Sequence, residues 1–203
     1  METKKFELTE ETIKYDGHTL YRIIALKDFD DVKKGDLGGF VESEDNLSQF
    51  GECWISGYAK VYDDAFVYRN ARISNNANVF GQAEIYGDAF VYGNSRVYDY
   101  AVVHEKAEIR DNAKIYGNAV IIGNAVIRGN AKVVVLTDYL TFIKAWGNGT
   151  FITWTRSNNM WNDCCFHGTG EELIKKAYKD SEISGKNYES LVEYVNKFIS
   201  INK

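Results

Sequence analysis

The hydrophobic and polar positions in the middle of the chain repeat with a period of six residues. A small residue recurs at every sixth position, and a β-branched residue stands two positions after it. The small residues are Cys53, Ala59, Ala65, Ala71, Ala77, Ala83, Ala89, Ser95, Ala101, Ala107, Ala113, Ala119, Ala125 and Ala131. The β-branched residues are Ile55, Val61, Val67, Ile73, Val79, Ile85, Val91, Val97, Val103, Ile109, Ile115, Ile121, Ile127 and Val133. Side chains alternate along a strand, so the two residues of each unit point to the same side. A period of six excludes a helix, and the pattern predicts short strands joined by corners.

The corners and the unit as a whole suggest a family. The two positions between units are usually Gly followed by Asn or Asp, types that adopt turn conformations at low cost. The unit Gly-Asn-Ala-x-Val/Ile-x resembles the hexapeptide-repeat family, whose fold is a left-handed parallel β-helix with three hexads per coil. The resemblance implies that the small residue and the Val or Ile both point inward. The repeats would make between four and five coils, roughly 22 Å tall at the usual spacing of stacked strands. We therefore predict a mainly β fold with a left-handed parallel β-helix over residues 47–136.

The segment before the repeat is predicted to be an N-terminal β cap, residues 1–46. Asp16 and Gly17 form a typical hairpin turn before the apolar strand 20–26. The stretch 33–41 is expected to be a turn that leads into the β-helix. A solenoid exposes apolar coils at its ends, so such a cap is required.

The segment after the repeat, residues 137–203, is predicted to be a C-terminal α+β cap with two hairpins and two helices. The hairpin turns are expected at 147–149 and 157–159. The first helix begins at the capping box Thr169–Glu172, and the second begins near Asn187.

Both flanking segments also carry a resemblance. Residues 24–48 resemble the N-terminal segment of YdcK-like hexapeptide proteins, many of which are found in phages and prophages. Residues 138–142 and 165–172 resemble a C-terminal cap that recurs in phage-associated hexapeptide proteins. The resemblance implies a phage- or prophage-encoded protein, and it implies a fold rather than an activity.

Composition limits the class of protein. The chain has 203 residues, of which 45% are hydrophobic, enough to bury a sizeable core. The net charge is −5 with no block of like charge, so we expect neither membrane-surface nor non-specific nucleic-acid binding. Cys53, Cys164 and Cys165 form no C-x-x-C pair and no disulfide framework. With no targeting or membrane segment evident, a cytoplasmic protein without a cofactor or metal is expected.

Catalysis has limited support, and we expect a protein that is not an enzyme. Acyltransferases that resemble this family use a histidine as general base at a cleft between subunits. His104 is the candidate here because it stands at an outward position, although a solvent-facing ladder residue would look the same. No loop interrupts residues 53–136, which removes the usual substrate arm. A zinc enzyme of the γ-carbonic anhydrase type would need three histidines in the repeat, and the pair Cys165 and His167 lacks an evident third ligand.

The outward residues can be sorted by face, because every third hexad stacks and positions 18 apart form columns. The first face, which we call the aromatic–basic face, combines a row of rings with a row of cations. Its candidate binding residues are Lys60, Tyr62, Phe80, Arg96, Tyr98, Lys114, Tyr116 and Lys132. Rings for bases and cations for phosphate would suit an anionic, nucleotide-like ligand. Alternatively, the rings only stabilise stacked strands and the lysines keep the face soluble.

The second face, which we call the apolar face, is too apolar to be left in water. Its residues are Phe66, Tyr68, Tyr86, Val102, Val120 and Ile122. We expect it to be the interface of a homo-oligomer, a trimer or a dimer, or else to be covered by a cap. The third or mixed face is expected to be a partly solvated surface. It carries Arg72, Phe90, Tyr92, Glu108, Arg110 and Arg128.

These observations lead to one functional hypothesis and two alternatives. The hypothesis is a non-enzymatic binding protein on a rigid β-helix that antagonises a host defence protein or sequesters its nucleotide signal. The alternatives are a hexapeptide-type acyltransferase that uses His104 and a purely structural component. The C-terminal cap offers further candidate contact residues, although the core of a small cap would contain similar aromatic side chains. These residues are Trp154, Arg156, Trp161 and His167.

Overall fold

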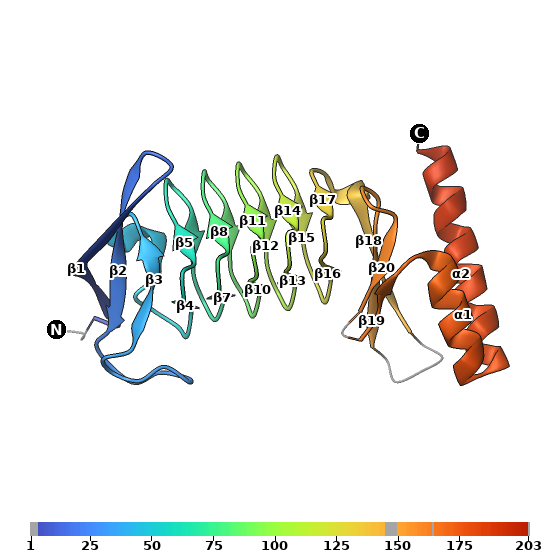
Figure 1. Ribbon diagram of the computed structural model, residues 1–203, viewed down its shortest axis with the longest axis horizontal. Coiled ribbons are helices and arrows are strands. Elements are labelled where there is room, and N and C mark those ends of the chain that lie inside the picture. Colours follow the sequence, from blue (N-terminus) through green and yellow to red (C-terminus); the bar gives the residue numbers. More distant parts are fainter. Residues whose placement is uncertain (1–3, 145–149, 164, 203) are drawn as a thin grey trace.

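The computed structural model describes residues 4–144, 150–163 and 165–202. It is an elongated body in which a β hairpin, a stack of coils, a small sheet and two helices follow one another (Figure 1). The predicted turn at 147–149 and Cys164 lie outside the described residues. No helix in the described part of the chain is long and apolar enough to cross a membrane.

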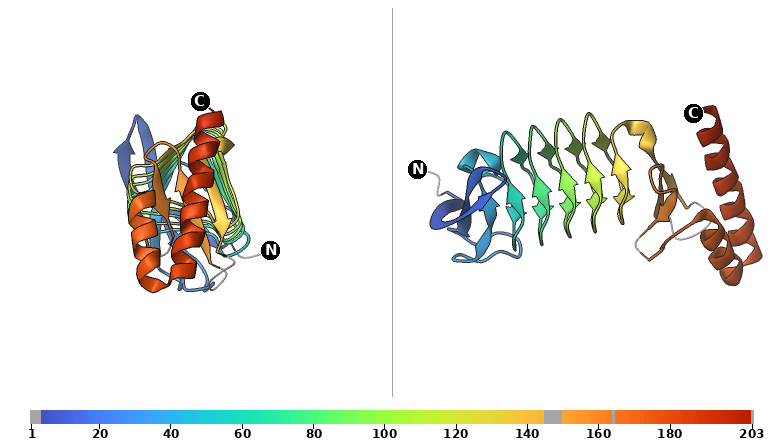
Figure 2. Two further views of the ribbon diagram at one scale, coloured as in Figure 1. Left: turned by 90° about the vertical axis from the view of Figure 1, so that its right-hand side faces the viewer. Right: turned by 45° about the horizontal axis from the view of Figure 1, so that its top comes forward.

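Each hexad from Trp54 to Val133 forms one two-residue strand. The strands are β4 (Trp54–Ile55), β5 (Lys60–Val61), β6 (Phe66–Val67), β7 (Arg72–Ile73), β8 (Asn78–Val79), β9 (Glu84–Ile85), β10 (Phe90–Val91), β11 (Arg96–Val97), β12 (Val102–Val103), β13 (Glu108–Ile109), β14 (Lys114–Ile115), β15 (Val120–Ile121), β16 (Val126–Ile127) and β17 (Lys132–Val133). Strands 18 residues apart pair in parallel and build three sheets. The right-hand view of Figure 2 shows the coils stacked one after another. The coils make about five turns, and the predicted fold class is confirmed.

The inward residues are those that the repeat predicts. Every small residue and every β-branched residue of the hexads is buried in one continuous core. Ser95, which replaces alanine once, is also buried, and its hydroxyl donates to the Tyr92 carbonyl at 2.8 Å. The hydroxyl is therefore accommodated without an unpaired polar atom.

The corners contain an alternation that is visible only when the coils are stacked. The first corner residue of every hexad from 51 to 129 has a positive φ, and along each column of stacked corners glycine alternates with a residue that has a side chain. In one column Asp63, Gly81, Asp99 and Gly117 follow one another, with φ of 56°, 68°, 59° and 65°. A Cβ added to Gly81 would lie 2.9 Å from the Asp99 backbone nitrogen. The Asp63 carboxylate accepts the Gly81 N–H at 3.0 Å, so a side chain on one coil uses the space left by a glycine on the next.

The N-terminal cap extends one sheet of the solenoid. Strands β1 (Phe6–Tyr15) and β2 (His18–Ala25) form an antiparallel hairpin with the predicted turn at Asp16 and Gly17. The prediction of a turn over 33–41 is wrong in its second half, because β3 (Leu37–Val41) pairs with both β2 and β5. Gly38 and Gly39 of this strand do not form a turn and instead allow close packing against neighbouring backbone. A Cβ on Gly39 would lie 2.6 Å from the Ala59 carbonyl oxygen.

The N-terminal end of the solenoid is capped by hydrogen-bond donors. Between coils, the N–H groups of outward residues donate to the carbonyls of inward residues on the next coil, as Lys60 does to Ala77 and Tyr62 to Val79. The inward carbonyls of the first coil therefore need donors from outside the coils. The buried Lys5 ammonium donates to the carbonyls of Cys53 at 2.9 Å and Gly51 at 3.3 Å. The Asn46 amide, beside the short 3₁₀ helix η1 (Glu44–Asn46), donates to the Ala65 carbonyl at 3.0 Å. These donors satisfy backbone groups that would otherwise be buried and unpaired.

At the C-terminal end, the N–H groups of outward residues in the last coil have no further coil to donate to and find acceptors in the cap. The Val126 N–H donates to the Thr153 hydroxyl at 3.0 Å, and the Ile122 N–H donates to the Tyr139 hydroxyl at 3.3 Å. The acceptors come from the segment after the coils. This segment comprises η2 (Leu136–Asp138), β18 (Tyr139–Ile143), β19 (Phe151–Thr155), β20 (Met160–Asn162) and β21 (His167–Gly168). The antiparallel sheet β18–β21 therefore caps the solenoid chemically as well as sterically.

Two helices complete the C-terminal cap. Helix α1 (Gly170–Asp180) begins at the predicted capping box, in which Thr169 and Glu172 bond each other's backbone. Helix α2 (Glu182–Ile201) begins five residues before the predicted start near Asn187. The Ser181 hydroxyl accepts the Ser184 N–H and starts the helix ahead of its apolar stretch.

Candidate functional site

The predicted row of rings on the aromatic–basic face forms a regular stack. Tyr62, Phe80, Tyr98 and Tyr116 have centroid separations of 5.0, 4.9 and 5.1 Å and interplanar angles of 2°, 4° and 2°. Since one ring lies over the next, the faces of the rings are in contact with neighbouring rings of the stack. The stack therefore presents ring edges and tyrosine hydroxyls outward, and base stacking is not the use that this geometry favours.

The cations of this face lie beside the rings in strand register. Lys60, Asn78, Arg96, Lys114 and Lys132 pair across β5, β8, β11, β14 and β17. The Arg96 guanidinium lies 5.1 Å from the Phe80 ring centre and 5.5 Å from that of Tyr98. In the described part of the chain, Arg96, Lys114 and Lys132 form no ion pair with a carboxylate. These three cations are the open part of the row.

The N-terminal end of the aromatic–basic face, at Tyr62 and Lys60, is covered by other parts of the chain. Tyr62 is only 1% exposed, so the prediction that it contacts a ligand is contradicted. The Lys60 ammonium donates to the Tyr58 carbonyl at 2.9 Å and lies 4.7 Å from the Tyr15 ring centre, and burial lowers its pKa. The tip of the β1–β2 hairpin supplies Tyr15 and covers Tyr62. The repeat pattern contains no sign that the hairpin would fold over this face.

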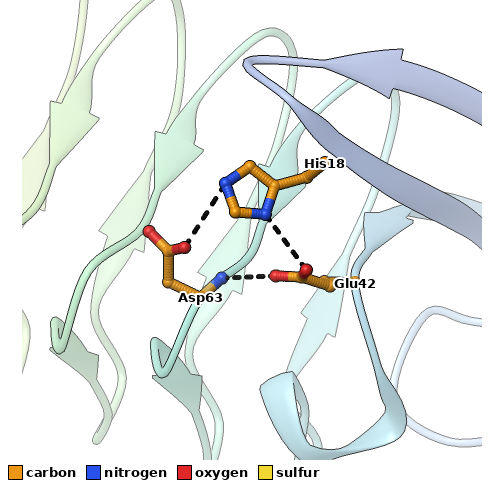
Figure 3. Close-up of side chains that lie close together, drawn as sticks. All are labelled: His18, Glu42 and Asp63. Atoms are coloured by element: carbon orange, nitrogen blue, oxygen red, sulfur yellow. Dashed lines mark hydrogen bonds and ion pairs between the residues drawn. The ribbon is translucent and has the colours of Figure 1, made fainter.

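A histidine between two carboxylates joins the hairpin to the solenoid (Figure 3). His18 at the start of β2 contacts Glu42, which follows β3, and Asp63, the corner residue after β5. The Nδ1 atom lies 3.0 Å from Glu42 Oε1, and Nε2 lies 3.4 Å from Asp63 Oδ1. Among the described residues, these three side chains form a group whose possible ligand atoms lie within 4.8 Å of one another, close enough to hold a metal ion. Sequence reasoning missed it because its members come from three separate segments.

Electrostatics supports a protonated histidine in this cluster. The hydrogen bond with Glu42 raises the pKa of His18, and the charges of Glu42, Asp63 and Asp16 act in the same direction. The hydrogen bond with His18 correspondingly lowers the pKa of Glu42, assisted by the Asp63 N–H. The two shifts agree in sign, as expected for an ion pair.

The apolar face carries a second stack of rings. Tyr68, Tyr86 and His104 follow one another at 4.7 and 4.8 Å, and Phe66 stacks on Tyr68 at 5.0 Å. Glu84, which was not assigned to this face from the sequence, accepts the Tyr68 hydroxyl at 3.1 Å. Burial, together with this hydrogen bond, raises the pKa of Tyr68 to about 12.

The remaining residues of the apolar face stay accessible. Val102 and Val120 are half-buried, and Ile122 is 42% exposed. The C-terminal cap reaches only the end of this face, where the Tyr139 hydroxyl donates to the Val120 carbonyl at 3.1 Å. The cap therefore leaves most of the apolar face available for another surface.

His104 borders a groove of about 690 Å³ at the edge of the apolar face, which Arg69, Glu105 and Lys106 also line. The contact that the structure gives its ring is stacking on Tyr86. Within the described residues no carboxylate bonds the His104 ring, as an orienting group would for a general base. The groove offers space for a ligand but not an assembled acid–base pair.

The arginines of the mixed face are paired. Arg72 bonds Asp30 and Asp31 beside a groove of about 890 Å³. The other pairs are Arg110 with Glu108 at 3.1 Å and Arg128 with Asp111 at 3.2 Å. The partly solvated surface expected from the sequence thus consists of neutralised charges.

The candidate residues of the C-terminal cap divide into core and surface. Trp154 and Trp161 are buried in the cap core, so their use as contact residues is contradicted. The Arg156 guanidinium lies 5.5 Å from the Phe198 ring centre and donates to the Asn202 carbonyl at 3.2 Å. His167 is exposed as a residue, and its Nδ1 lies 2.6 Å from Asn162 Oδ1. Partial desolvation of its ring lowers its pKa.

Comparison with known proteins agrees with the geometry of the coils. No curated protein matches the chain. Residues 89–105 and 113–129, which contain β10–β12 and β14–β16, match the family model described as YdcK beta solenoid repeat. In its coils the chain is thus similar to the YdcK beta-solenoid repeat, and a scaffold of this kind fits a structural or interaction role.

Proposed function

We propose that the protein is a non-enzymatic interaction scaffold that binds an acidic partner protein on its aromatic–basic face. The observation that carries this proposal is the row of Arg96, Lys114 and Lys132, whose charges meet no carboxylate in the described structure. Consecutive coils hold them about 4.8 Å apart on a rigid sheet, so little side-chain order has to be created on binding. The hydroxyls of Tyr98 and Tyr116 lie beside them and can bond carboxylates.

A protein partner fits this face better than a nucleotide. The ring faces are stacked on one another, whereas a nucleotide signal would need a free face for its base. The resemblance of the flanking segments to phage-associated proteins suggests that the partner is a host protein, including a defence protein. The protein would act in the cytoplasm of the host cell.

Charge reversal tests the proposal. The variant Lys114→Glu with Lys132→Glu should abolish binding of a poly-glutamate peptide measured by calorimetry, because it turns an attractive row into a repulsive one. A matched control, Lys175→Glu with Lys179→Glu on exposed positions of α1, changes the net charge equally and should keep binding. Equal loss in both variants, or binding of a cyclic dinucleotide in place of the peptide, would contradict the proposal.

We further propose that the apolar face is the interface of a homo-oligomer. Phe66 and Ile122, at opposite ends of the face, are both at least 36% exposed, and half-buried valines lie between them. Val120→Glu with Ile122→Glu should yield monomers by light scattering. Phe90→Glu on the mixed face is the control, and a wild-type chain that is already monomeric would refute this assignment.

An acyltransferase is the second candidate, favoured by the groove beside His104. It requires that acetyl-coenzyme A raises the melting temperature and that His104→Ala abolishes transfer. The absence of a thermal shift with the wild-type protein would remove this candidate.

A further inference from the structure

The tip of the β1–β2 hairpin covers the first ring of the aromatic–basic face. The Tyr15 ring lies edge-on to Tyr62 at 6.0 Å, and the His18 ring lies 5.0 Å from it. The Tyr62 hydroxyl donates to the Asp16 carboxylate at 3.5 Å, a long hydrogen bond. The tip therefore covers Tyr62, whereas Tyr98 and Tyr116 of the same stack remain accessible.

The tip is set apart from the base of the hairpin by irregular pairing. The register of β1 with β2 shifts between Leu8 and Thr12, and that of β2 with β3 shifts between Arg22 and Ile24. Residues 12–21, which we call the strap, form a short regular segment beyond the β1–β2 shift. At its end Tyr21 pairs with Val41 of β3, and Leu20 is buried with Phe40 and Tyr62. Bulges interrupt the ladder of backbone bonds and allow one part of a hairpin to bend against another.

His18 fastens the strap to the solenoid in a way that requires a proton. Its two ring nitrogens face two different carboxylates, Glu42 and Asp63. Only the imidazolium carries N–H groups on both nitrogens, whereas neutral imidazole would turn a lone pair toward one carboxylate. The carboxylates are held in place, since the Asp63 N–H donates to Glu42 at 2.9 Å and the Gly81 N–H donates to Asp63 at 3.0 Å.

The charged surroundings of His18 come from every element that packs on it. Glu42 after β3, Asp63 after β5 and Asp16 in the hairpin turn all favour the protonated ring. The Lys60 ammonium of β5 meets the strap at another point, 4.7 Å from the Tyr15 ring centre. The charges that act on this imidazole are thus those of three carboxylates.

We propose that the strap is a proton-dependent cover: with His18 protonated it is fastened over Tyr62, and loss of this proton releases it. Release uncovers Tyr62 and the adjacent end of the aromatic–basic face. The geometry favours a proton over a metal ion, because an ion would bind one ring nitrogen whereas the carboxylates lie at both. The release of the strap does not depend on the proposed function. The further idea, that release enlarges the surface available to a partner, rests on the proposed function.

The direction of the pH dependence follows from the two shifts. A raised pKa for His18 stabilises the fastened strap below the ordinary value of 6.5, and this stabilisation is lost as the pH rises through the shifted value. A lowered pKa for Glu42 stabilises it above the ordinary value of 4.5. The strap is therefore held best between these values and is released on the alkaline side.

Two measurements on the full chain test the proposal together. An NMR titration gives the pKa of His18, with His18→Gln to assign its signal. Hydrogen exchange, corrected for intrinsic rates, gives the protection of the amides of residues 12–21 between pH 5 and 9. Protection of the strap should fall by about tenfold for each unit by which the His18 pKa is raised, while the amides of the coils keep theirs.

Variants separate the strap from the rest of the fold. His18→Gln and Glu42→Gln should lower the protection of the strap at pH 5 and remove its pH dependence, with the coils unchanged. Glu11→Gln, which alters another carboxylate of the hairpin that pairs with Arg22, is the matched control and should behave as wild type. A pH dependence that persists in His18→Gln would overturn the proposal. So would protection of the strap that micromolar Zn²⁺ restores at pH 9 and a chelator removes.

Discussion

The alternation of glycine and side chain in the stacked corners predicts that two similar substitutions differ in their effect. Gly93 and Gly123 occupy the same position of their hexads, with φ of 75° and 70°. A Cβ on Gly93 would lie 2.8 Å from the backbone nitrogen of Asp111 on the next coil. On Gly123, in the last coil, the nearest neighbour of a Cβ would be the end of the Glu105 side chain at 3.8 Å.

The magnitudes follow from these contacts. Placing alanine in the left-handed region costs about 1–2 kcal/mol at either position. The clash at Gly93 is with backbone, which cannot turn away, and overpacking of this kind adds about 1–3 kcal/mol. We therefore expect Gly123→Ala to lose about 1–2 kcal/mol of unfolding free energy, and Gly93→Ala about 2–5 kcal/mol.

Equilibrium unfolding in guanidinium chloride, followed by circular dichroism and tryptophan fluorescence, measures the difference. Coincident transitions are needed, because stacked repeats can unfold in parts. Equal losses in Gly93→Ala and Gly123→Ala would show that stacking does not select glycine at these corners, and the positive φ alone would then explain it.

Three other perturbations test the caps. Lys5→Met removes the donor to the Cys53 carbonyl and should destabilise the protein by about 1–3 kcal/mol in the same assay, and no loss would contradict the capping role. Thr153→Val removes the acceptor of the Val126 N–H and should speed hydrogen exchange in the last coil while leaving the first coil unchanged. Burial of Asp163 acts to raise its pKa, but its hydrogen bonds outweigh burial and lower the pKa. Its contribution to the stability of the cap is therefore present above pH 3.8 and is lost in acid. Near-UV dichroism should show the cap loosening below that pH before the coils unfold, and Asp163→Asn should abolish this early step.

The sequence predicts the inside of the solenoid well because burial there depends on a period that each hexad repeats. Ala83 and Ile85 need only alternate along a strand to meet the same core as their equivalents 18 residues away. The capping box at Thr169 is likewise local, since its two partners are three residues apart. Such features can be inferred from neighbouring residues alone.

What the sequence misses depends on contacts between distant segments. Gly38 and Gly39 suggest a turn, and their role in close packing against β4 and Ala59 is visible only once β3 is placed. The burial of Tyr62 depends on a hairpin more than 40 residues earlier in the chain. The sequence predicts which residues share the aromatic–basic face, but not which of them the strap covers.

The polarity of the coils explains why the two caps differ in chemistry and restricts where a function can arise. The carbonyls of the inward residues accept bonds from the preceding coil, so the Cys53 carbonyl at the first coil needs a donor such as Lys5. The N–H groups of the outward residues donate to the following coil, so the Val126 N–H at the last coil needs an acceptor such as Thr153. The inward positions are restricted to small and β-branched side chains by the core, and the corners by stacking. Only the outward strand positions are free of these demands. The fold therefore does not require the row of Arg96, Lys114 and Lys132, cations that meet no carboxylate in the described residues, and this is the reason to seek the partner on that face.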